Sequence, residues 1–516
     1  MNVVALHRPA RVSGVSTAGL HAAFLDPPWR PLVIGPDLTE ADLAQTPLAA
    51  APNAMICPWP AEADPVEQVL RVRDALRALH ADVVVPNDLP HGFAAAALDH
   101  HRGLRCAAWL HSASHDGEAL VTSCFELADA WRAVSHEGRR RAQETAEALG
   151  LSLPPARAIA PGFLSVPDAA PPLPPLSPLR MLYAGKLEKH HKRVLDLAAL
   201  CAQMRVPFHL TLAGDGPAEA ELRAAIAPHA GNVTLLGPTS PKDMPALFAS
   251  HHVLLLVSAS EAAPLCVMEA MAHARPAAIT ASCGEASRWV RDGVDGVIVP
   301  TGDMAALGER LSSLSFEALD AMSRAAHQRA GELFSARSRG PALQALIEEA
   351  AAAPQDHNHQ RRWTRLLHAL AAIGPVSPDR VQALADAWRA ELGEDLDLPL
   401  SVTPRPTPAE RRLTRAVQTL AEEGRTRLAL YGAGLHTRRV ARTIASIPSI
   451  LAIIDDNAGK PHGPPATLAG KPVLPPSAYP SLNADALILS SDEHEREMLA
   501  RARPFADRVV PLYQTA

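Results

Sequence analysis

The chain has 516 residues, of which 47% are hydrophobic and 20% are charged. This length exceeds one ordinary core, and the composition is that of a folded protein of about three domains rather than a disordered one. The net charge of −6 is mild for this length, so we expect no nucleic-acid partner, which would call for a clustered basic excess.

The cysteines and the apolar runs bear on the cellular compartment. The six cysteines are scattered without a C-x-x-C pair, which indicates reduced thiols rather than a disulfide or zinc framework. No basic start leads into a long apolar segment, and no window reaches the about 18 uncharged apolar residues of a membrane span. We expect a cytoplasmic protein that could meet a membrane only at its inner face.

Apolar runs alternate with helical patterns along the first 166 residues, which predicts a parallel sheet covered by helices. The expected strands are "NVVAL", "RPLVIG", "ADVVVPN", "RCAAWLH", "DAWRAVS" and "ARAIAPG". The Pro-rich stretch "PDAAPPLPPLSPL", residues 167–179, then reads as an extended linker and a domain boundary.

Residues 167–350 carry a second alternating set, with strands expected at "RMLYAG", "FHLTLAG", "NVTLLG", "HVLLLVS", "PAAIT" and "GVIVP". Several of these end in Gly or Ser at the carboxyl end, where open α/β sheets place their ligands. Residues 351–425 are mostly helical in pattern and form an expected linker. Residues 426–516 begin a third α/β unit, with "RLALYGAGLHTRRVARTI", "ILAIIDDN" and "DALILSS".

Polar residues follow the strands of the second set. "YAGKLEKHHKR" places Gly185, Lys186 and Lys192 after a strand, where alone they would favour a solvated cationic loop, and "LAGDGP" places Gly214 in a tight turn. Glu261 and Glu269 stand eight residues apart around an apolar run, and two carboxylates there would be costly to bury unpaired.

Pro264 is positioned to begin a helix, on which Leu265, Met268 and Ala272 would face the core and Glu269 a cleft. About five residues of helix at ~1.5 Å each then separate Glu269 from the loop that bears Glu261. This separation suits two points of one extended nucleotide-sugar, the ribose diol and the hexose.

Taken together, residues 180–303 resemble the donor-binding domain of the family 4 glycosyltransferases, retaining enzymes of the GT-B fold. The motifs that carry the resemblance are "AGKLEKHHKR", "AGDGP", "LLG", "VSASE", "EAMAHARP" and "CGEASRWVRDGVDGVIVP". The resemblance implies an α/β chain with two Rossmann-like domains facing across a cleft. It also implies sugar transfer, with retention, from a nucleoside-diphosphate sugar to a hydroxyl of a glycan, lipid-linked or protein acceptor in cell-surface glycan synthesis.

The same resemblance implies residue roles. Lys186 and Lys192 would grip the diphosphate, Glu269 the ribose hydroxyls, and Glu261 would lie near the donor sugar. The backbone of the loop and helix start that follow Glu261 would face the phosphate and sugar. The further donor-binding positions are Gly14, Gly185, Gly214, Ala263, Pro264 and Leu265. Ala262 and Ala263 replace the usual Gly-Phe of the family, which bears on the choice of sugar.

The first domain resembles the acceptor domain of the family more weakly. Gly14 would approach the diphosphate, with an ordinary turn glycine as the competing interpretation. His111 ends the strand in "CAAWLHSASHD" and becomes the catalytic candidate beside the donor sugar, together with Glu261 and Lys192. Ser135 is expected to line the cleft or cap a helix, and residues 139–141, three arginines, could touch an anionic membrane surface or form a solvated helix face.

No metal and no cofactor are required by this scheme, because cations and a helix N-terminus would stabilise the leaving diphosphate. The D-x-D string at Asp395 and Asp397 lies in the helical linker, and we interpret it as chance. The histidine clusters have no carboxylate-rich spacing beside them, so we predict no metal site.

The third unit has G-x-G-x-x-T at Gly432, Gly434 and Thr437, and Asp455 follows at the spacing of a ribose-binding acid. It resembles the small Rossmann-like units attached to sugar acyltransferases and methyltransferases, so a bound nucleotide and a docking module are both open. Two alternatives for the whole chain remain: a nicotinamide-dependent sugar oxidoreductase acting through this unit, and a non-catalytic nucleotide-sugar-binding scaffold.

Overall fold

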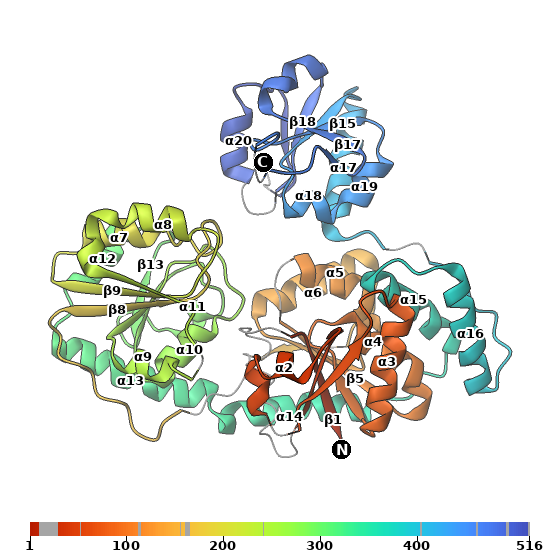
Figure 1. Cartoon of the computed structure of the whole chain (residues 1–516), viewed down its shortest axis with the longest axis horizontal. Helices are drawn as coiled ribbons and strands as arrows, with labels where there is room; N and C mark the ends of the chain where they lie inside the picture. Colours follow the sequence, from red (N-terminus) through yellow and green to blue (C-terminus); the bar gives the residue numbers. More distant parts are fainter. Residues whose placement is uncertain are drawn as a thin grey trace. The chain divides into compact units, whose positions relative to one another are not determined.

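The structure, a computed structural model, describes residues 1–9, 29–51, 53–111, 115–154, 156–159, 166–240, 242–402, 405–460, 463–491 and 495–513. It divides into two compact units, Met1–Arg405 and Pro406–Ala516. The first unit holds two parallel sheets and the second unit a third sheet (Figure 1). None of the described helices combines the length and apolar character that a membrane span requires.

The first sheet has seven parallel strands in the order β3-β2-β1-β4-β5-β6-β7. Their bounds are β1 Val3–His7, β2 Arg30–Pro36, β3 Met55–Trp59, β4 Val83–Val85, β5 Arg105–Leu110, β6 Ala130–Ala133 and β7 Arg157–Ala158. All six strands expected here are confirmed. The edge strand β3 was not predicted, because it contains a proline and is only partly buried, as edge strands often are.

Helices pack on both faces of this sheet. They are α2 Glu40–Leu43, α3 Pro65–Ala78, α4 Pro90–Asp99, α5 His115–Cys124 and α6 His136–Leu149. Helix α3 begins with Pro65 at its first position, and the Asp64 carboxylate caps it by accepting the N–H groups of Val66 and Glu67. Helices α15 His359–Ile373 and α16 Pro378–Leu392, from the predicted helical linker, share the core on the α3–α4 face, where Trp363 stacks on Trp388.

The second sheet has six parallel strands in the order β10-β9-β8-β11-β12-β13. Their bounds are β8 Leu179–Ala184, β9 Phe208–Ala213, β10 Val233–Gly237, β11 Val253–Leu256, β12 Ala277–Thr280 and β13 Gly296–Val299. The covering helices are α7 Asp196–Gln203, α8 Glu219–Ala225, α9 Met244–Ala249, α10 Leu265–Ala272, α11 Ala286–Trp289, α12 Met304–Ser312 and α13 Phe316–Phe334. The next helix, α14 Ala336–Ala352, packs on the first sheet instead, where Leu343 and Ile347 join the hydrophobic cluster of Trp109. All six predicted strands are confirmed.

Side-chain alternation along these strands builds two cores. In β8, Met181 and Tyr183 point to the face covered by α7, α8 and α12, whereas Leu182 points to the face covered by α9, α10 and α13 (Figure 1). Because both faces are covered, the strands read as continuous apolar runs, which is why sequence patterns located them well.

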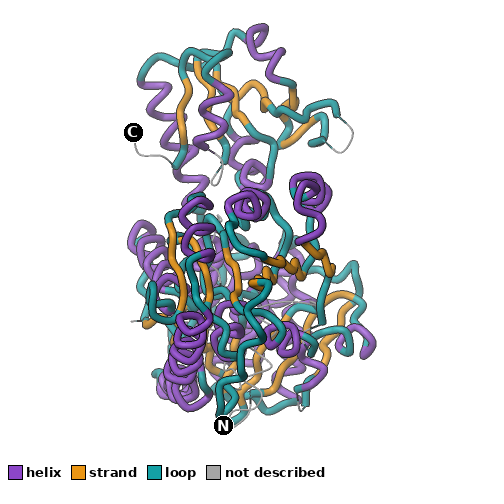
Figure 2. Tube along the Cα trace, turned by 90° about the vertical axis from the view of Figure 1, so that its left-hand side faces the viewer, coloured by secondary structure: helices purple, strands orange, loops and turns teal. Residues whose placement is uncertain are grey.

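The second unit contains a six-stranded sheet in the order β16-β17-β15-β14-β18-β19, parallel except for the β16–β17 pair. The strands are β14 Leu428–Tyr431, β15 Ile450–Ile454, β16 Thr467–Leu468, β17 Lys471–Leu474, β18 Ala486–Leu489 and β19 Val509–Pro511. The helices are α17 Pro408–Glu422, α18 Leu435–Arg439, α19 Ala441–Ser446 and α20 Glu495–Ala502. Figure 2 shows helices on both sides of this sheet. Helices α17 and α19 cover one face and α20 the other, as labelled in Figure 1, so α17, expected in the linker, packs with this sheet.

Candidate active site

Two glycine loops interlock at the carboxyl edge of the second sheet. Gly214 after β9 has a φ of +141°, and a Cβ there would lie 2.0 Å from the carbonyl oxygen of Gly185, which follows β8. Gly216 has a φ of +156°, and its Cβ would lie 2.3 Å from the Leu187 carbonyl oxygen. Only glycine allows this approach of two backbones. The structure therefore brings together the two glycines predicted for the site, Gly185 and Gly214.

Backbone hydrogen bonds hold the two loops in register. The N–H of Gly185 donates to Ala213 O at 3.0 Å, and the N–H of Leu187 donates to Asp215 O at 2.6 Å. The buried Tyr183 hydroxyl donates to the carbonyl oxygen of Lys186 at 2.8 Å. The Lys186 backbone is thereby fixed while its side chain is exposed, and among the described residues it has no ion-pair partner.

The next turn of this loop is organised by Glu188, which the sequence analysis did not single out. Its carboxylate accepts the backbone N–H groups of His190, His191 and Lys192 at 3.0, 2.6 and 3.1 Å. Burial raises the pKa of Glu188, but the three donors outweigh it and hold the pKa below its ordinary value. A second backbone bond, from Ala259 N–H to His191 O at 2.8 Å, ties this turn to the loop after β11.

Glu261 has partners within the protein. Its Oε1 accepts from the Lys192 ammonium at 2.5 Å and from the Ser258 hydroxyl at 2.7 Å. The Glu261 side chain is only 8% exposed and that of Lys192 is 23% exposed. The burial cost of this carboxylate is therefore met by an ion pair rather than by a ligand alone.

Glu269 lies on α10 and is in a different situation. Helix α10 begins at Leu265 with Pro264 as its N-cap, one residue later than predicted, while Met268 and Ala272 are buried as expected and Leu265 only partly so. Burial raises the pKa of Glu269 to about 7. No described residue donates a hydrogen bond to its carboxylate, which therefore stands half-buried and available to a donor.

The loop between these glutamates is fixed by the chain after β12. Gly284 has a φ of +54°, and a Cβ there would lie 1.9 Å from the Glu261 carbonyl oxygen. The N–H of Glu285 donates to Ala262 O at 3.1 Å. Ala262 and Ala263 pack against a hydrophobic cluster of the first sheet that includes Trp29 and Trp109. Nothing in the sequence pointed to Gly284 as the residue that sets this loop.

His111 directly follows β5 and is held by neighbouring polar groups. Its Nε2 lies 3.0 Å from Asn87 Oδ1, and its backbone N–H donates to the Asp88 carboxylate at 3.1 Å. Its ring centroid lies 4.7 Å from that of Trp109. Burial, with a smaller contribution from His7, lowers the pKa of His111 to about 3, so the imidazole is neutral.

His7 and Asn87 are site-edge residues that sequence reasoning missed. His7 ends β1, is buried, and has its pKa lowered to about 3 by burial. Asn87 has a φ of +46°, and its Nδ2 donates to Leu6 O at 3.1 Å. A signal was present, since "LH" and "PND" put polar residues directly after apolar strands.

Two predicted residues of the first domain remain. Gly14 lies outside the described residues. Ser135 caps α6 by accepting the Gly138 N–H at 2.9 Å, which is one of the two roles expected for it.

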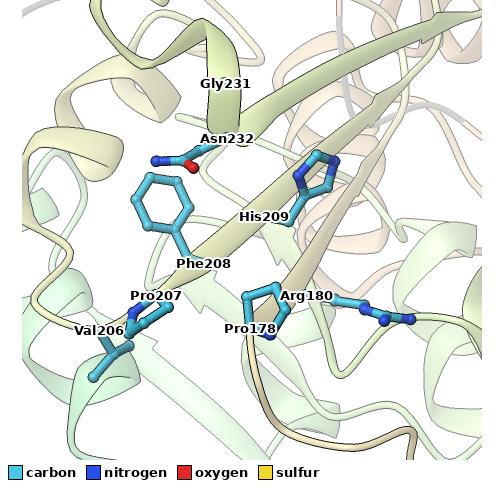
Figure 3. A pocket seen from close by; sticks show the side chains of 8 residues that line it. All are labelled: Pro178, Arg180, Val206, Pro207, Phe208, His209, Gly231 and Asn232. Atoms are coloured by element: carbon cyan, nitrogen blue, oxygen red, sulfur yellow. The ribbon is translucent and has the colours of Figure 1, made fainter.

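One cavity of the domain built on the second sheet lies away from these loops. Figure 3 shows a pocket of about 480 Å³ whose lining includes Pro178, Arg180, Phe208 and Asn232. These residues begin or precede β8, β9 and β10, so the pocket lies at the amino edge of the sheet, opposite the glycine loops. Over the described parts of the chain, no group of three or more His, Cys, Asp or Glu is arranged to hold a metal ion.

The predicted residues of the third unit also meet. Gly432 has a φ of +104°, Thr437 Oγ1 donates to Gly432 O, and Gly434 is the N-cap of α18. The Asp455 carboxylate accepts the N–H groups of Ala433 at 2.8 Å and Asn457 at 2.9 Å. The Asp455 carboxylate therefore stabilises the glycine turn that follows β14.

Comparison with known proteins identifies the second sheet. Residues 178–315 match the sequence model of a family described as "Glycosyl transferases group 1". The domain that these residues form is a glycosyltransferase domain. The fold class and the enzyme class predicted from the sequence are thereby confirmed.

Solved structures agree with this glycosyltransferase in fold. Anabaena Alr3699/HepE in complex with UDP-glucose is 15% identical, with 67% of this chain and 99% of that chain covered and a TM-score of 0.55. The apo form of the lipopolysaccharide outer core galactosyltransferase WaaB is 16% identical over 67% and 99%, with a TM-score of 0.51. A glycosyltransferase from Rickettsia africae ESF-5 is 14% identical over 67% and 98%, with a TM-score of 0.51. No curated protein matches the sequence.

Proposed function

We propose that this glycosyltransferase moves a hexose from a UDP-sugar to a hydroxyl acceptor, with retention and without a metal. The observation that carries the proposal is the Lys192–Glu261 ion pair beside interlocked glycine loops at the carboxyl edge of the second sheet. Lys186 lies in one of these loops, and Glu269 lies on α10, the helix that follows Glu261. The UDP-glucose complex of Alr3699/HepE, a structure of the same fold, supports a UDP-sugar as donor, and the galactosyltransferase WaaB supports a hexose as the transferred sugar.

The diphosphate leaving group needs positive potential where its charge develops. The exposed Lys186 ammonium supplies it from a fixed backbone, and Lys192 keeps two N–H donors beyond the one given to Glu261. The first N–H groups of α10, after Ala263 and Pro264, add the positive end of a helix dipole. In this scheme the leaving phosphate takes the proton of the attacking hydroxyl.

The two glutamates divide the donor between them. Both hydrogen bonds to Glu261 reach Oε1, so Oε2 remains to accept a hydroxyl of the donor sugar. Glu269, ionised, accepts the two ribose hydroxyls. His111 bonds Asn87 Oδ1 through Nε2, which assigns the proton to Nε2 and makes Nδ1 the acceptor. His111 is then a neutral hydrogen-bonding partner of the sugar rather than a general acid.

The remaining assignments extend the proposal along the chain. Residues 1–166 act on the acceptor side, residues 167–350 bind the donor, residues 351–425 link, and residues 426–516 bind a nucleotide or dock a partner. The acceptor is a glycan, lipid-linked or protein hydroxyl in cell-surface glycan synthesis, reached from the cytoplasm with peripheral membrane contact. No observation favours the oxidoreductase alternative, because Asp455 accepts two backbone N–H groups where a ribose would bind.

The test is a thermal-shift and donor-hydrolysis panel of UDP-, GDP- and ADP-sugars on wild type and Glu269→Ala. A donor at about 100 times its Kd stabilises the wild type by about 2.7 kcal/mol, and Glu269→Ala loses this response. Glu309→Ala, an exposed position on α12, is the matched control and responds like wild type. The proposal fails if no nucleotide-sugar stabilises the wild type or if Glu269→Ala responds equally.

A further inference from the structure

Two adjoining cavities lie where the start of α6 meets the chain after β12. The backbone N–H of His136 donates to Glu285 Oε1 at 2.7 Å, and His136 Nδ1 lies 3.0 Å from the same carboxylate. The cavities measure about 220 and 370 Å³ and share His136, Glu285 and Arg288 in their walls. We call them together the arginine pocket, because Arg139 and Arg339 also line it.

Three arginines that line this pocket, Arg139, Arg288 and Arg339, make no ion pair among the described residues. Arg139 and Arg339 each bury an Nε that has no hydrogen-bond partner among the described residues, and Arg139 makes only a 3.4 Å bond to Ala156 O through its Nη1. Arg288 is exposed and makes no ion pair within the same residues. Burial lowers the pKa of Arg339, against a smaller opposite effect of Glu285. A buried donor without an acceptor costs free energy, which an entering anion would remove.

The other charged residues near the arginine pocket do not neutralise its excess of positive charge. Arg140 also lines the pocket, but its guanidinium is bonded to Glu137 and Glu144. Glu137 in turn accepts from Arg141, which does not line the pocket. The lining therefore holds four arginines against two carboxylates. Glu137 is engaged with Arg140 and Arg141, and Glu285 with His136, which leaves Arg139, Arg288 and Arg339 without an ion pair among the described residues. A planar guanidinium matches phosphate and carboxylate oxygens in geometry and charge.

The pocket shares a wall with the donor site. The chain that carries Glu285 also places Gly284 against the Glu261 carbonyl oxygen and donates an N–H to Ala262 O. We propose that the arginine pocket binds an anionic group of the acceptor, a phosphate or a carboxylate, next to the loop that holds the donor sugar. This inference rests on the proposed function and names the substrate class that the same enzyme takes.

The experiment uses the full chain saturated with UDP, so that the donor site is filled. Glucose 6-phosphate, glucuronate and glucose are titrated by calorimetry as phosphate, carboxylate and neutral probes. We expect an anionic probe to bind and glucose to bind more weakly. The double variant Arg139→Gln/Arg288→Gln should bind that probe about tenfold or more weakly, since charge-assisted hydrogen bonds are lost. Arg141→Gln, on the same helix, should bind it like wild type.

The outcomes separate this inference from the donor assignment. Binding of the phosphate probe alone points to a phosphorylated acceptor, and binding of glucuronate alone to an acidic sugar. The inference is overturned if neither anion binds, if glucose binds as tightly, or if Arg141→Gln loses as much as the double variant. UDP binding, measured first, should be unchanged in the double variant; its absence in wild type would sink the proposed donor while the probes, titrated without UDP, still test the pocket.

Discussion

The Lys192 ammonium lies 2.5 Å from Glu261 Oε1, and this ion pair joins the loop after β8 to the loop after β11. Two residues assigned to different parts of the donor, the diphosphate and the sugar, are thus in contact with each other. The pair fixes the geometry of the two loops. Lys192 keeps two N–H donors and Glu261 keeps Oε2 for a ligand.

Breaking the pair should destabilise the protein. Lys192→Met leaves the 8% exposed Glu261 carboxylate with only Ser258 as a partner, which we expect to cost about 2–3 kcal/mol in the free energy of unfolding by urea. Adding Glu261→Gln should recover part of this loss, with a coupling of about 1 kcal/mol in a double-mutant cycle. Strict additivity of the two substitutions would contradict the pairing.

Gly284→Ala should disturb the donor loop without a cavity or a lost side chain. The new Cβ would stand 1.9 Å from Glu261 O at a φ of +54°, so the loop must shift. We expect a loss of about 2 kcal/mol or more in stability and a marked loss of donor-induced thermal shift. Gly293→Ala is the matched control, because its φ is +74° but no atom lies within 4 Å of the new Cβ. Equal losses of stability in both variants would show that the positive φ, and not the close contact with Glu261 O, causes the loss.

The raised pKa of Glu269 predicts pH-dependent donor binding. Ribose hydroxyls need the ionised carboxylate, so affinity for UDP-glucose should rise as pH rises through about 7. UDP-glucose is the suitable probe because its diphosphate is a diester that does not titrate near neutral pH. Glu269→Gln should bind weakly with little pH dependence, and calorimetry between about pH 6 and about pH 8 measures both.

The same group sets the sign of a stability effect. In the folded state Glu269 holds its proton up to about 7, against an ordinary value of 4.5, so the folded state binds more protons between these values. Its contribution to the free energy of unfolding therefore falls as pH rises from 4.5 to about 7, by about 2 kcal/mol, and Glu269→Gln removes this decline. Urea unfolding curves across this range provide the check.

The stability that His111 contributes should change with pH in the direction opposite to that of Glu269. Its pKa is lowered from 6.5 to about 3, so the unfolded state binds more protons in between, and the stability that His111 contributes is present above 6.5 and lost as pH falls. At about pH 5 the loss is about 2 kcal/mol, and His111→Gln, which can still bond Asn87, should lose less. A variant as acid-sensitive as wild type would assign the effect to other groups, such as His7.

Arg275 should stabilise the Pro-rich linker. Its buried guanidinium donates to carbonyl oxygens of Pro171, Pro172, Phe248, Ala249 and Ala274 at 2.8–3.1 Å. Arg275→Met leaves these acceptors without their donor and should cost about 3 kcal/mol in urea unfolding, with Arg275→Lys intermediate because one ammonium cannot reach all of them.

The control for this variant is an exposed arginine of the same domain. Arg223 pairs with Glu219 on the surface, and Arg223→Met should change stability by less than about 0.5 kcal/mol. Limited proteolysis gives a second readout, since a released linker would be cleaved between residues 167 and 178 in Arg275→Met and not in the control.

Sequence patterns alone located the strands of the second sheet and the glycine loops at their carboxyl ends. Strands buried on both faces read as continuous apolar runs, and a glycine needed for backbone-to-backbone approach, such as Gly214, is visible as a residue type. The edge strand β3 was not predicted, because it is only partly buried and contains a proline, so its residues do not form a continuous apolar run.

The pairing of charged side chains is visible only in the folded structure. Lys192 and Glu261 are 69 residues apart, and sequence reasoning gave both of them to a ligand before the fold paired them with each other. Asp455 stands at the spacing of a ribose ligand, yet its carboxylate bonds the turn beside it. The reason is physical: local pattern sets strand, helix and turn, whereas hydrogen-bond partners depend on side-chain directions that exist only once the loops are packed.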